Sequence, residues 1–170
     1  IAAGIDAFKI EGRLRDARYT KTVGRCYREA IDSYFNNTFT KEKIQNWKKE
    51  LGEVYNRGFS TGFYFKKPGA EEFTYDLANS QATSKKVHVG IITNYFPKVS
   101  VASIKMLSGT IKRGDEILIE GKTTYLTQKV ESIEINGVPR DKLLKGEVSG
   151  IKVNARVRKN DHIYVIVSNV

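Results

Sequence analysis

The sequence predicts an α+β chain in which a short strand and two helices precede a small antiparallel β-barrel. Apolar residues recur at helical spacing between about residues 14 and 55, whereas from residue 86 onward the apolar period changes to two. Turn-forming residues interrupt the second half at near-regular intervals, as in small all-β domains. We therefore predict two parts, residues 1–83 and residues 84–170.

The first element is predicted to be a buried strand over residues 5–10, because Ile5, Ala7, Phe8 and Ile10 form a mostly apolar run typical of an inner parallel strand. Such a strand needs neighbours on both sides to satisfy its backbone hydrogen bonds. We expect residues 1–36 to be the last βα unit of a larger α/β domain whose other strands lie outside this sequence.

Two helices are predicted next. The first ends at Asn36-Asn37, and its apolar stripe consists of Val23, Tyr27, Ala30, Ile31, Tyr34 and Phe35. The second begins after Thr40 as its N-cap, ends near Tyr55, and places Ile44, Trp47 and Leu51 at helical spacing. We expect residues 56–65 to be extended chain packed on the domain and residues 70–84 to be a linker.

Six strands are predicted in the second half. They cover residues 87–95, 99–106, 116–120, 125–135, 147–153 and 162–167. Asn136-Gly137 favours positive φ and predicts a tight turn. Short strands at this spacing predict a closed or nearly closed barrel.

The charge balance points to a polyanionic partner. The chain has 29 Lys and Arg against 19 Asp and Glu, and residues 81–170 hold 15 basic and 8 acidic side chains. This excess favours nucleic acid, with plain solubility as the alternative. Tyr95, Phe96 and Tyr125 could stack on bases. The candidate phosphate-binding residues are Lys98, Lys105, Lys112, Arg113, Lys122, Lys129, Arg156, Arg158 and Lys159.

The remaining chemistry-bearing residues are sparse. Cys26 is the single cysteine, which excludes an intramolecular disulfide, fits a reducing cytoplasm and predicts a packed thiol. His88 and His162 stand alone in predicted strands, and we interpret both as structural. No nucleophile–base pair, zinc triad, phosphate loop or membrane-spanning run is found, so we expect a cytoplasmic chain with no metal site and no membrane partner.

Three stretches resemble a known family. Residues 4–13, the helix around residues 27–32, and residues 55–64 resemble the end of the catalytic region of the peptidase U32 family. Residues 109–117 and 157–161 are similar to turns in the C-terminal domain of this family, which resembles the second-domain β-barrel of translation elongation factors.

The resemblance implies a TIM-like barrel upstream, with residues 4–10 as its last strand. Active sites of such barrels lie at the C-terminal ends of the strands. Lys9, Glu11 and Arg13 would then lie at the barrel mouth, where Arg13 could bind a carboxylate or phosphate and Glu11 could orient it or accept a proton. The alternative is a Glu11–Arg13 salt bridge that seals the rim.

The resemblance also implies the possible activities. Members are described as collagenase-like peptidases, and some are associated with hydroxylation of RNA bases using an iron–sulfur cluster and prephenate. The family's cysteine signature is absent from this sequence, so we expect no cofactor here and a cluster upstream. Three roles remain open for the β part: binding tRNA or rRNA, positioning a peptide substrate along a sheet edge, or packing and oligomerisation. We expect no peptidase activity from this chain alone.

Overall fold

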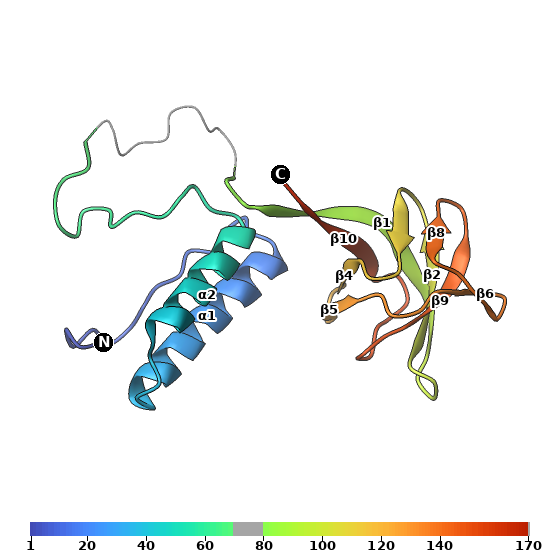
Figure 1. The fold of residues 1–170 in the computed structure, drawn as a ribbon, viewed down its shortest axis with the longest axis horizontal. Coiled ribbons are helices and arrows are strands. Elements are labelled where there is room, and N and C mark those ends of the chain that lie inside the picture. Colours follow the sequence, from blue (N-terminus) through green and yellow to red (C-terminus); the bar gives the residue numbers. More distant parts are fainter. Residues whose placement is uncertain (70–79, 170) are drawn as a thin grey trace. The chain divides into compact units, whose positions relative to one another are not determined.

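The computed structural model describes residues 1–69 and 80–169 and contains two helices and a large antiparallel sheet (Figure 1). The chain divides into two compact units. The helical unit comprises Ile1–Ser84 together with Asn169, and the β unit comprises Lys85–Ser168. The predicted α+β content is confirmed.

Both predicted helices form, and each begins at a side-chain cap. Helix α1 spans Ala17–Phe35, with the Asp16 carboxylate accepting the Tyr19 N–H at 2.9 Å. Helix α2 spans Lys41–Glu53, with the Thr40 hydroxyl accepting the Lys43 N–H at 3.3 Å. Each cap satisfies one of the backbone donors that a helix start leaves unpaired. The predicted Thr40 cap is therefore confirmed.

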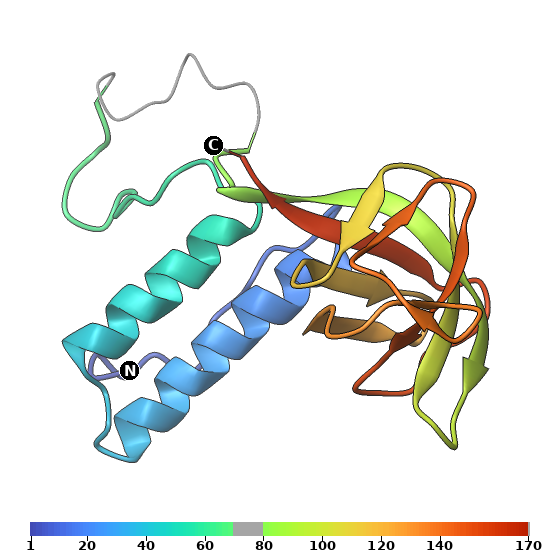
Figure 2. The same cartoon turned by 45° about the vertical axis from the view of Figure 1, so that its right-hand side comes forward.

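The two helices lie side by side as a hairpin (Figure 2). Val23 and Cys26 of α1 and Trp47 of α2 are buried. The predicted stripe on α1 is only partly correct, because Tyr27, Tyr34 and Phe35 remain exposed. The apolar stripe is wider than the surface that α2 alone can cover, and these three side chains lie on its outer side.

The predicted strand over residues 5–10 is not confirmed by this structure. Residues 1–15 contain no strand, and Ile5, Phe8 and Ile10 are 39–49% exposed. The ten described strands pair only among themselves, so this segment has no neighbouring strand with which to form a ladder. It runs along α1 instead, with the Phe8 and Tyr27 ring centroids 6.2 Å apart.

The segment after α2 is irregular, and the expectation that it packs on the domain is wrong. Phe59, Phe63, Tyr64 and Phe65 are 60–78% exposed. Of the predicted linker over residues 70–84, residues 70–79 lie outside the described residues. Residues 81 and 83 donate backbone hydrogen bonds to the carbonyls of residues 56 and 52, and so belong to the helical unit.

The β unit is built on an eight-stranded antiparallel sheet with the order β5-β4-β10-β1-β2-β9-β6-β7, and β3 and β8 form a second, two-stranded sheet. The strands are β1 (Ser84–Phe96), β2 (Val101–Met106), β3 (Thr110–Lys112), β4 (Glu116–Glu120), β5 (Tyr125–Lys129), β6 (Glu134–Ile135), β7 (Val138–Pro139), β8 (Lys142–Leu144), β9 (Val148–Lys152) and β10 (His162–Ser168).

Each predicted strand has a counterpart, although the run over residues 125–135 divides into β5 and β6. Between them Val130 and Ile133 leave the ladder and enter the core. The sequence reading missed β3, β7 and β8, which have only two or three residues. Asn136 and Gly137 have φ of 53° and 77° and join β6 to β7, which confirms the predicted tight turn.

One apolar core fills the β unit. Alternating side chains of the long strands enter it, among them Ile92 of β1, Ile104 of β2, Ile119 of β4 and Ile163 of β10, all fully buried. The sheet also curves back on itself. The side chain of Gln128 on β5 donates to the Lys152 carbonyl at 2.8 Å at the end of β9. This contact joins the edge strand to the other side of the sheet.

Candidate nucleic-acid interface

Three connections of the β unit meet at one end of the sheet. The strand register places the end of β4 beside the start of β10, and the start of β2 beside the end of β9. The Asn160 N–H donates to the Ile92 carbonyl near the end of β1. The β1–β2 turn (residues 97–100), the β4–β5 turn (residues 121–124) and the β9–β10 connection (residues 153–161) therefore share this end. We call it the cationic end.

Charge is unevenly divided between this end and the other connections. The three connections hold five basic residues and one acidic residue, Asp161. The remaining connections between strands hold three basic and four acidic residues. Asp161 is buried, and its carboxylate accepts the Arg158 backbone N–H at 2.7 Å. The cationic end therefore presents a concentrated positive surface rather than an evenly mixed one. Its basic residues are Lys98, Lys122, Arg156, Arg158 and Lys159.

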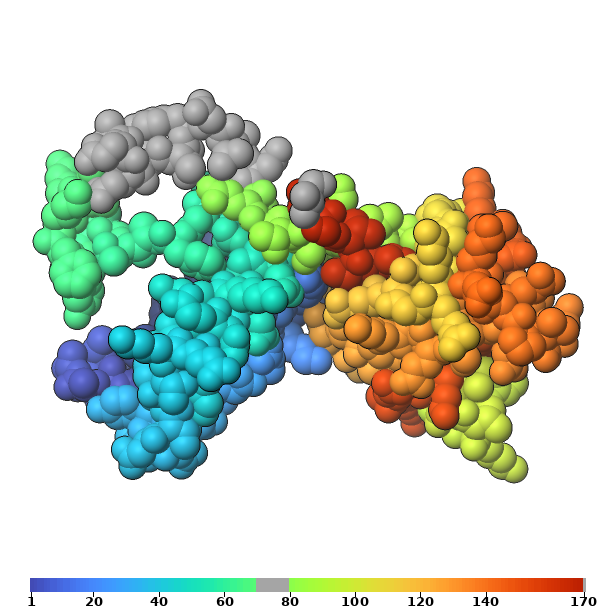
Figure 3. All heavy atoms as spheres, in the orientation of Figure 1, coloured from blue at the N-terminus to red at the C-terminus, as the bar shows by residue number. Residues whose placement is uncertain are grey.

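A groove of about 470 Å³ lies between the end of β1 and the β9–β10 connection. Tyr95 and Pro97 line one side, and Arg156, Arg158 and Lys159 line the other. In Figure 3 the tip of the β1–β2 hairpin (yellow-green) and the β9–β10 connection (red-orange) both lie along the lower edge of the β unit. An aromatic side chain beside three cations is the combination that binds bases and phosphates together.

The β9–β10 connection is held in place by contacts with the β4–β5 turn. The Arg158 guanidinium donates to the Thr124 hydroxyl at 3.0 Å, and this hydroxyl is on a buried residue of the β4–β5 turn. Gly121 lies so close to the Asp161 carboxylate that a Cβ there would overlap it. These contacts fix the β4–β5 turn against the β9–β10 connection, so the cations are presented on a rigid base.

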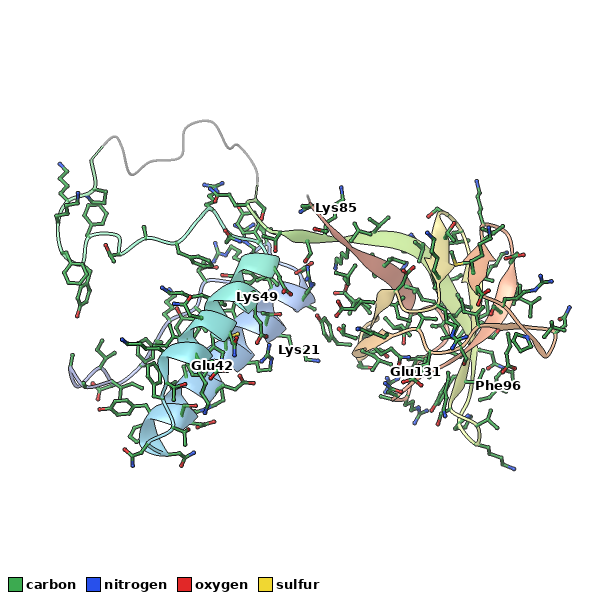
Figure 4. The ribbon with its side chains drawn as sticks, viewed as in Figure 1. Lys21, Glu42, Lys49, Lys85, Phe96 and Glu131 are labelled. Atoms are coloured by element: carbon green, nitrogen blue, oxygen red, sulfur yellow. The ribbon has the colours of Figure 1, made fainter. Side chains whose placement is uncertain are left out.

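Aromatic side chains flank the groove. Phe96 is 48% exposed at the tip of the hairpin and is labelled in Figure 4. Tyr95 is half-buried in the groove wall, and Tyr125 is half-buried at the start of β5. All three predicted stacking residues thus lie at or next to the cationic end.

The other four predicted cations lie elsewhere. Lys129 is the register partner of Glu116, which favours a neutralised pair on that face. Lys112 and Arg113 adjoin the turn in which the Asp115 carboxylate accepts the Lys112 N–H at 2.8 Å. Lys105 lies in the middle of the sheet opposite Val148. The structure therefore divides the nine predicted cations into a clustered five and a dispersed four.

Lys9, Glu11 and Arg13 lie in the exposed segment before α1. The Glu11 carboxylate accepts the Arg13 backbone N–H at 2.6 Å, and the Tyr19 hydroxyl donates to the Glu11 carbonyl at 3.3 Å. The carboxylate thus contacts the backbone of Arg13 and not its guanidinium. Among the described residues these side chains form no enclosed site.

The residues present do not fit an iron–sulfur cluster. Such clusters are held by several cysteine thiolates, and Cys26 is the single cysteine of the sequence. It is buried in α1, and burial raises the pKa of its thiol, so it stays a neutral packed group. Among the described residues no cluster of three or more His, Cys, Asp or Glu side chains could hold a metal ion.

His88 and His162 are not isolated, and the expectation that they stand alone is wrong. They lie on the neighbouring strands β1 and β10, with His162 Nδ1 3.1 Å from His88 Nε2. The sequence carries no local signal for this pair, because 74 residues separate the two positions.

The helical unit carries its own charged network. The Glu29 carboxylate accepts from the Arg25 guanidinium at 2.9 Å and from the Trp47 indole N–H at 3.0 Å, and Arg25 also pairs with Glu50. The hydrogen bond from Arg25 holds the pKa of Glu29 below its ordinary value. This network links α1 to α2.

The fold and the site together define a class of protein: a helical hairpin followed by an antiparallel β domain with a cationic end. Residues 1–74 match the model of peptidase family U32, so this part of the chain is similar to members of that family.

Curated relatives match both units. The chain is 39% identical over 167 residues to an uncharacterised protease of Methanocaldococcus jannaschii, covering 97% of this chain and 40% of the relative. It is 42% identical over 163 residues to a collagenase of Porphyromonas gingivalis, covering 95% of this chain and 39% of the relative. A tRNA hydroxylation protein of Bacillus subtilis is 31% identical over 134 residues, covering 78% of this chain and 31% of the relative.

The chain thus spans about two fifths or less of the length of these relatives. Neither helix of the described residues is long and apolar enough to cross a membrane.

Proposed function

We propose that this chain is the C-terminal portion of a U32-family protein, and that its β domain binds RNA through the cationic end. The observation that carries the proposal is the segregation of charge: five basic residues and one buried, hydrogen-bonded acid occupy the three connections that share this end. Phosphate contacts supply most of the sequence-independent affinity for nucleic acid. Similarity to a tRNA hydroxylation protein makes tRNA or rRNA the preferred partner.

In this proposal residues 1–36 form the last βα unit of a TIM-like catalytic barrel. The family match over residues 1–74 and the exposed apolar side chains of Ile5, Phe8 and Ile10 support it, because a buried barrel strand would hide such side chains. Lys9, Glu11 and Arg13 would then line the barrel mouth. A cluster, where the whole protein uses one, would be bound outside this chain, and the cytoplasm is the compartment we propose.

The test compares two triple variants with the same change in charge. The first replaces Lys98, Arg156 and Lys159 of the cationic end by Ala, and the control replaces Lys105, Lys112 and Arg113. Arg158 is left in place because its guanidinium bonds to Thr124. Binding of the chain to fluorescent tRNA is measured by anisotropy across a salt series.

The slope of log affinity against log salt is negative, and we expect the first variant to reduce its magnitude by roughly 2 to 3. Each lost phosphate contact removes about 0.7 to 0.9 from that magnitude. The control should change the slope far less. Equal losses in the two variants would show that only net charge matters, and no binding of tRNA at low salt would refute the proposal.

Substrate positioning for a peptidase is the second candidate, because the chain is 42% identical to a collagenase over 163 residues. The same titration with gelatin in place of tRNA separates the two. Binding of gelatin that resists salt, with no binding of tRNA, would favour this role. Packing or oligomerisation alone would leave both titrations flat and appear as self-association in sedimentation.

A further inference from the structure

The His88–His162 pair forms a second polar cluster on the β unit, built from neighbouring strands. The imidazole nitrogens His162 Nδ1 and His88 Nε2 are 3.1 Å apart, and the ring centroids are 5.0 Å apart. The Tyr164 ring lies 5.3 Å from the His88 ring and completes one side of the cluster. The three rings come from β1 and β10, which are adjacent in the sheet, so their spacing is fixed by backbone pairing.

This spacing suits two ligands of one metal ion. Imidazole nitrogens bind zinc at roughly 2.0–2.1 Å, so two of them in cis or tetrahedral positions lie about 2.9–3.4 Å apart. The observed 3.1 Å falls within that interval. Without an ion, the N–H of one ring donates a hydrogen bond to the unprotonated nitrogen of the other. An ion would use the lone pairs of both rings instead.

We propose that His88 and His162 bind a first-row divalent transition-metal ion such as Zn²⁺. Neutral imidazole is a preferred ligand of Zn²⁺, Ni²⁺ and Cu²⁺. His162 is exposed, so water can fill the remaining coordination positions. The described residues offer no cluster of three or more ligating side chains, and the site is therefore open and exchangeable rather than a closed structural one.

The charged groups around the pair are balanced. Glu120 of β4 is the register partner of His162, and its carboxylate pairs with the Lys86 ammonium at 2.6 Å. That ammonium lies 4.8 Å from the centre of the Tyr164 ring. Because Glu120 offsets the charge of Lys86, the cation next to the pair repels an incoming ion only weakly.

The test is isothermal titration of the whole chain with Zn²⁺, using His88→Gln and His162→Gln as the two ligand variants. Cys26→Ser is the matched control, because it removes the one thiol that could bind zinc elsewhere. We expect one ion per chain, an affinity at least ten-fold lower in each ligand variant, and no change in the control. Far-UV circular dichroism checks that the variants fold.

A second readout keeps the proposal testable where a variant does not fold. In the wild-type chain, NMR resonances of the His88 and His162 rings should shift together as Zn²⁺ is added. Three results would each overturn the proposal. These are ring resonances that do not shift, zinc affinity that survives both Gln variants, and no heat of binding at Zn²⁺ concentrations up to about 1 mM. Loss of tRNA binding in the cationic-end variant has no bearing on this result, so the two proposals fail separately.

Discussion

Gly90 marks the closest approach of β1 to β2, and Gly90→Ala tests how tightly these strands are packed. A Cβ at this position would lie 2.5 Å from the backbone oxygen of Lys105 and 3.4 Å from the Cα of Met106. Ordinary contact requires roughly 1 Å more than the first of these distances. The obstacle is backbone that is hydrogen-bonded on both sides, since β2 pairs with β1 and β9, so it cannot move aside as a side chain could.

We expect Gly90→Ala to lower the free energy of unfolding of the β unit by about 1–3 kcal/mol, the usual cost of overpacking a well-ordered core. The matched control is Gly24→Ala in α1, where a Cβ would have no neighbour within 4 Å. There the substitution should stabilise the helical unit by up to about 1 kcal/mol, because alanine restricts the unfolded chain and favours helix.

The assay is unfolding in urea, monitored by amide hydrogen exchange of peptides from each unit. This readout measures the stability of the two units separately. The expected result is that the free energy of unfolding falls for the β unit in Gly90→Ala and rises for the helical unit in Gly24→Ala. A β unit whose stability changes by less than about 0.5 kcal/mol in Gly90→Ala, the range of an ordinary surface substitution, would refute the packing argument.

Two further predictions concern the helical unit, with fluorescence of Trp47 as the readout. Thr40→Ala removes the hydroxyl that accepts the Lys43 N–H and should lower the free energy of unfolding by about 1 kcal/mol. Thr40→Ser keeps a hydroxyl at this position and should retain most of the stability. Equal unfolding midpoints for the two variants would contradict this expectation. The hydrogen bond from Arg25 lowers the pKa of Glu29 in the folded chain. The ionised Glu29 carboxylate therefore contributes its full stabilisation above the ordinary carboxyl pKa of about 4.3, and this stabilisation is lost as the pH falls through the lower folded pKa. Glu29→Gln should remove this pH dependence, and an unchanged acid transition in that variant would exclude the mechanism.

Local signals in the sequence predicted the elements well. The Thr40 cap and the Asn136-Gly137 turn were readable because each depends on residues within a few positions. The strand expected over residues 5–10 is not seen, because an apolar run forms a strand only when a partner strand is present. The exposure of residues 59–65 could not be foreseen either, because aromatic residues usually predict burial.

The candidate sites depended on long-range pairing. Composition identified a basic second half, but the gathering of Lys122 with Arg156 requires β4 and β10 to be neighbours. The same pairing logic applies to His88 and His162, which meet only because β1 and β10 are adjacent. Sequence periodicity gives the face on which a side chain lies, but it does not give strand order. For this reason the residue types were predicted and their grouping was not.

The adjacency of β1 and β10 also has a consequence for engineering. The first and last strands of the β unit are antiparallel neighbours, so the chain enters and leaves it at one place. A fold with abutting ends can be inserted into the loop of a host protein, or rejoined end to end and reopened at another turn, with little distortion. The β unit is accordingly suited to transfer between proteins as an independent domain.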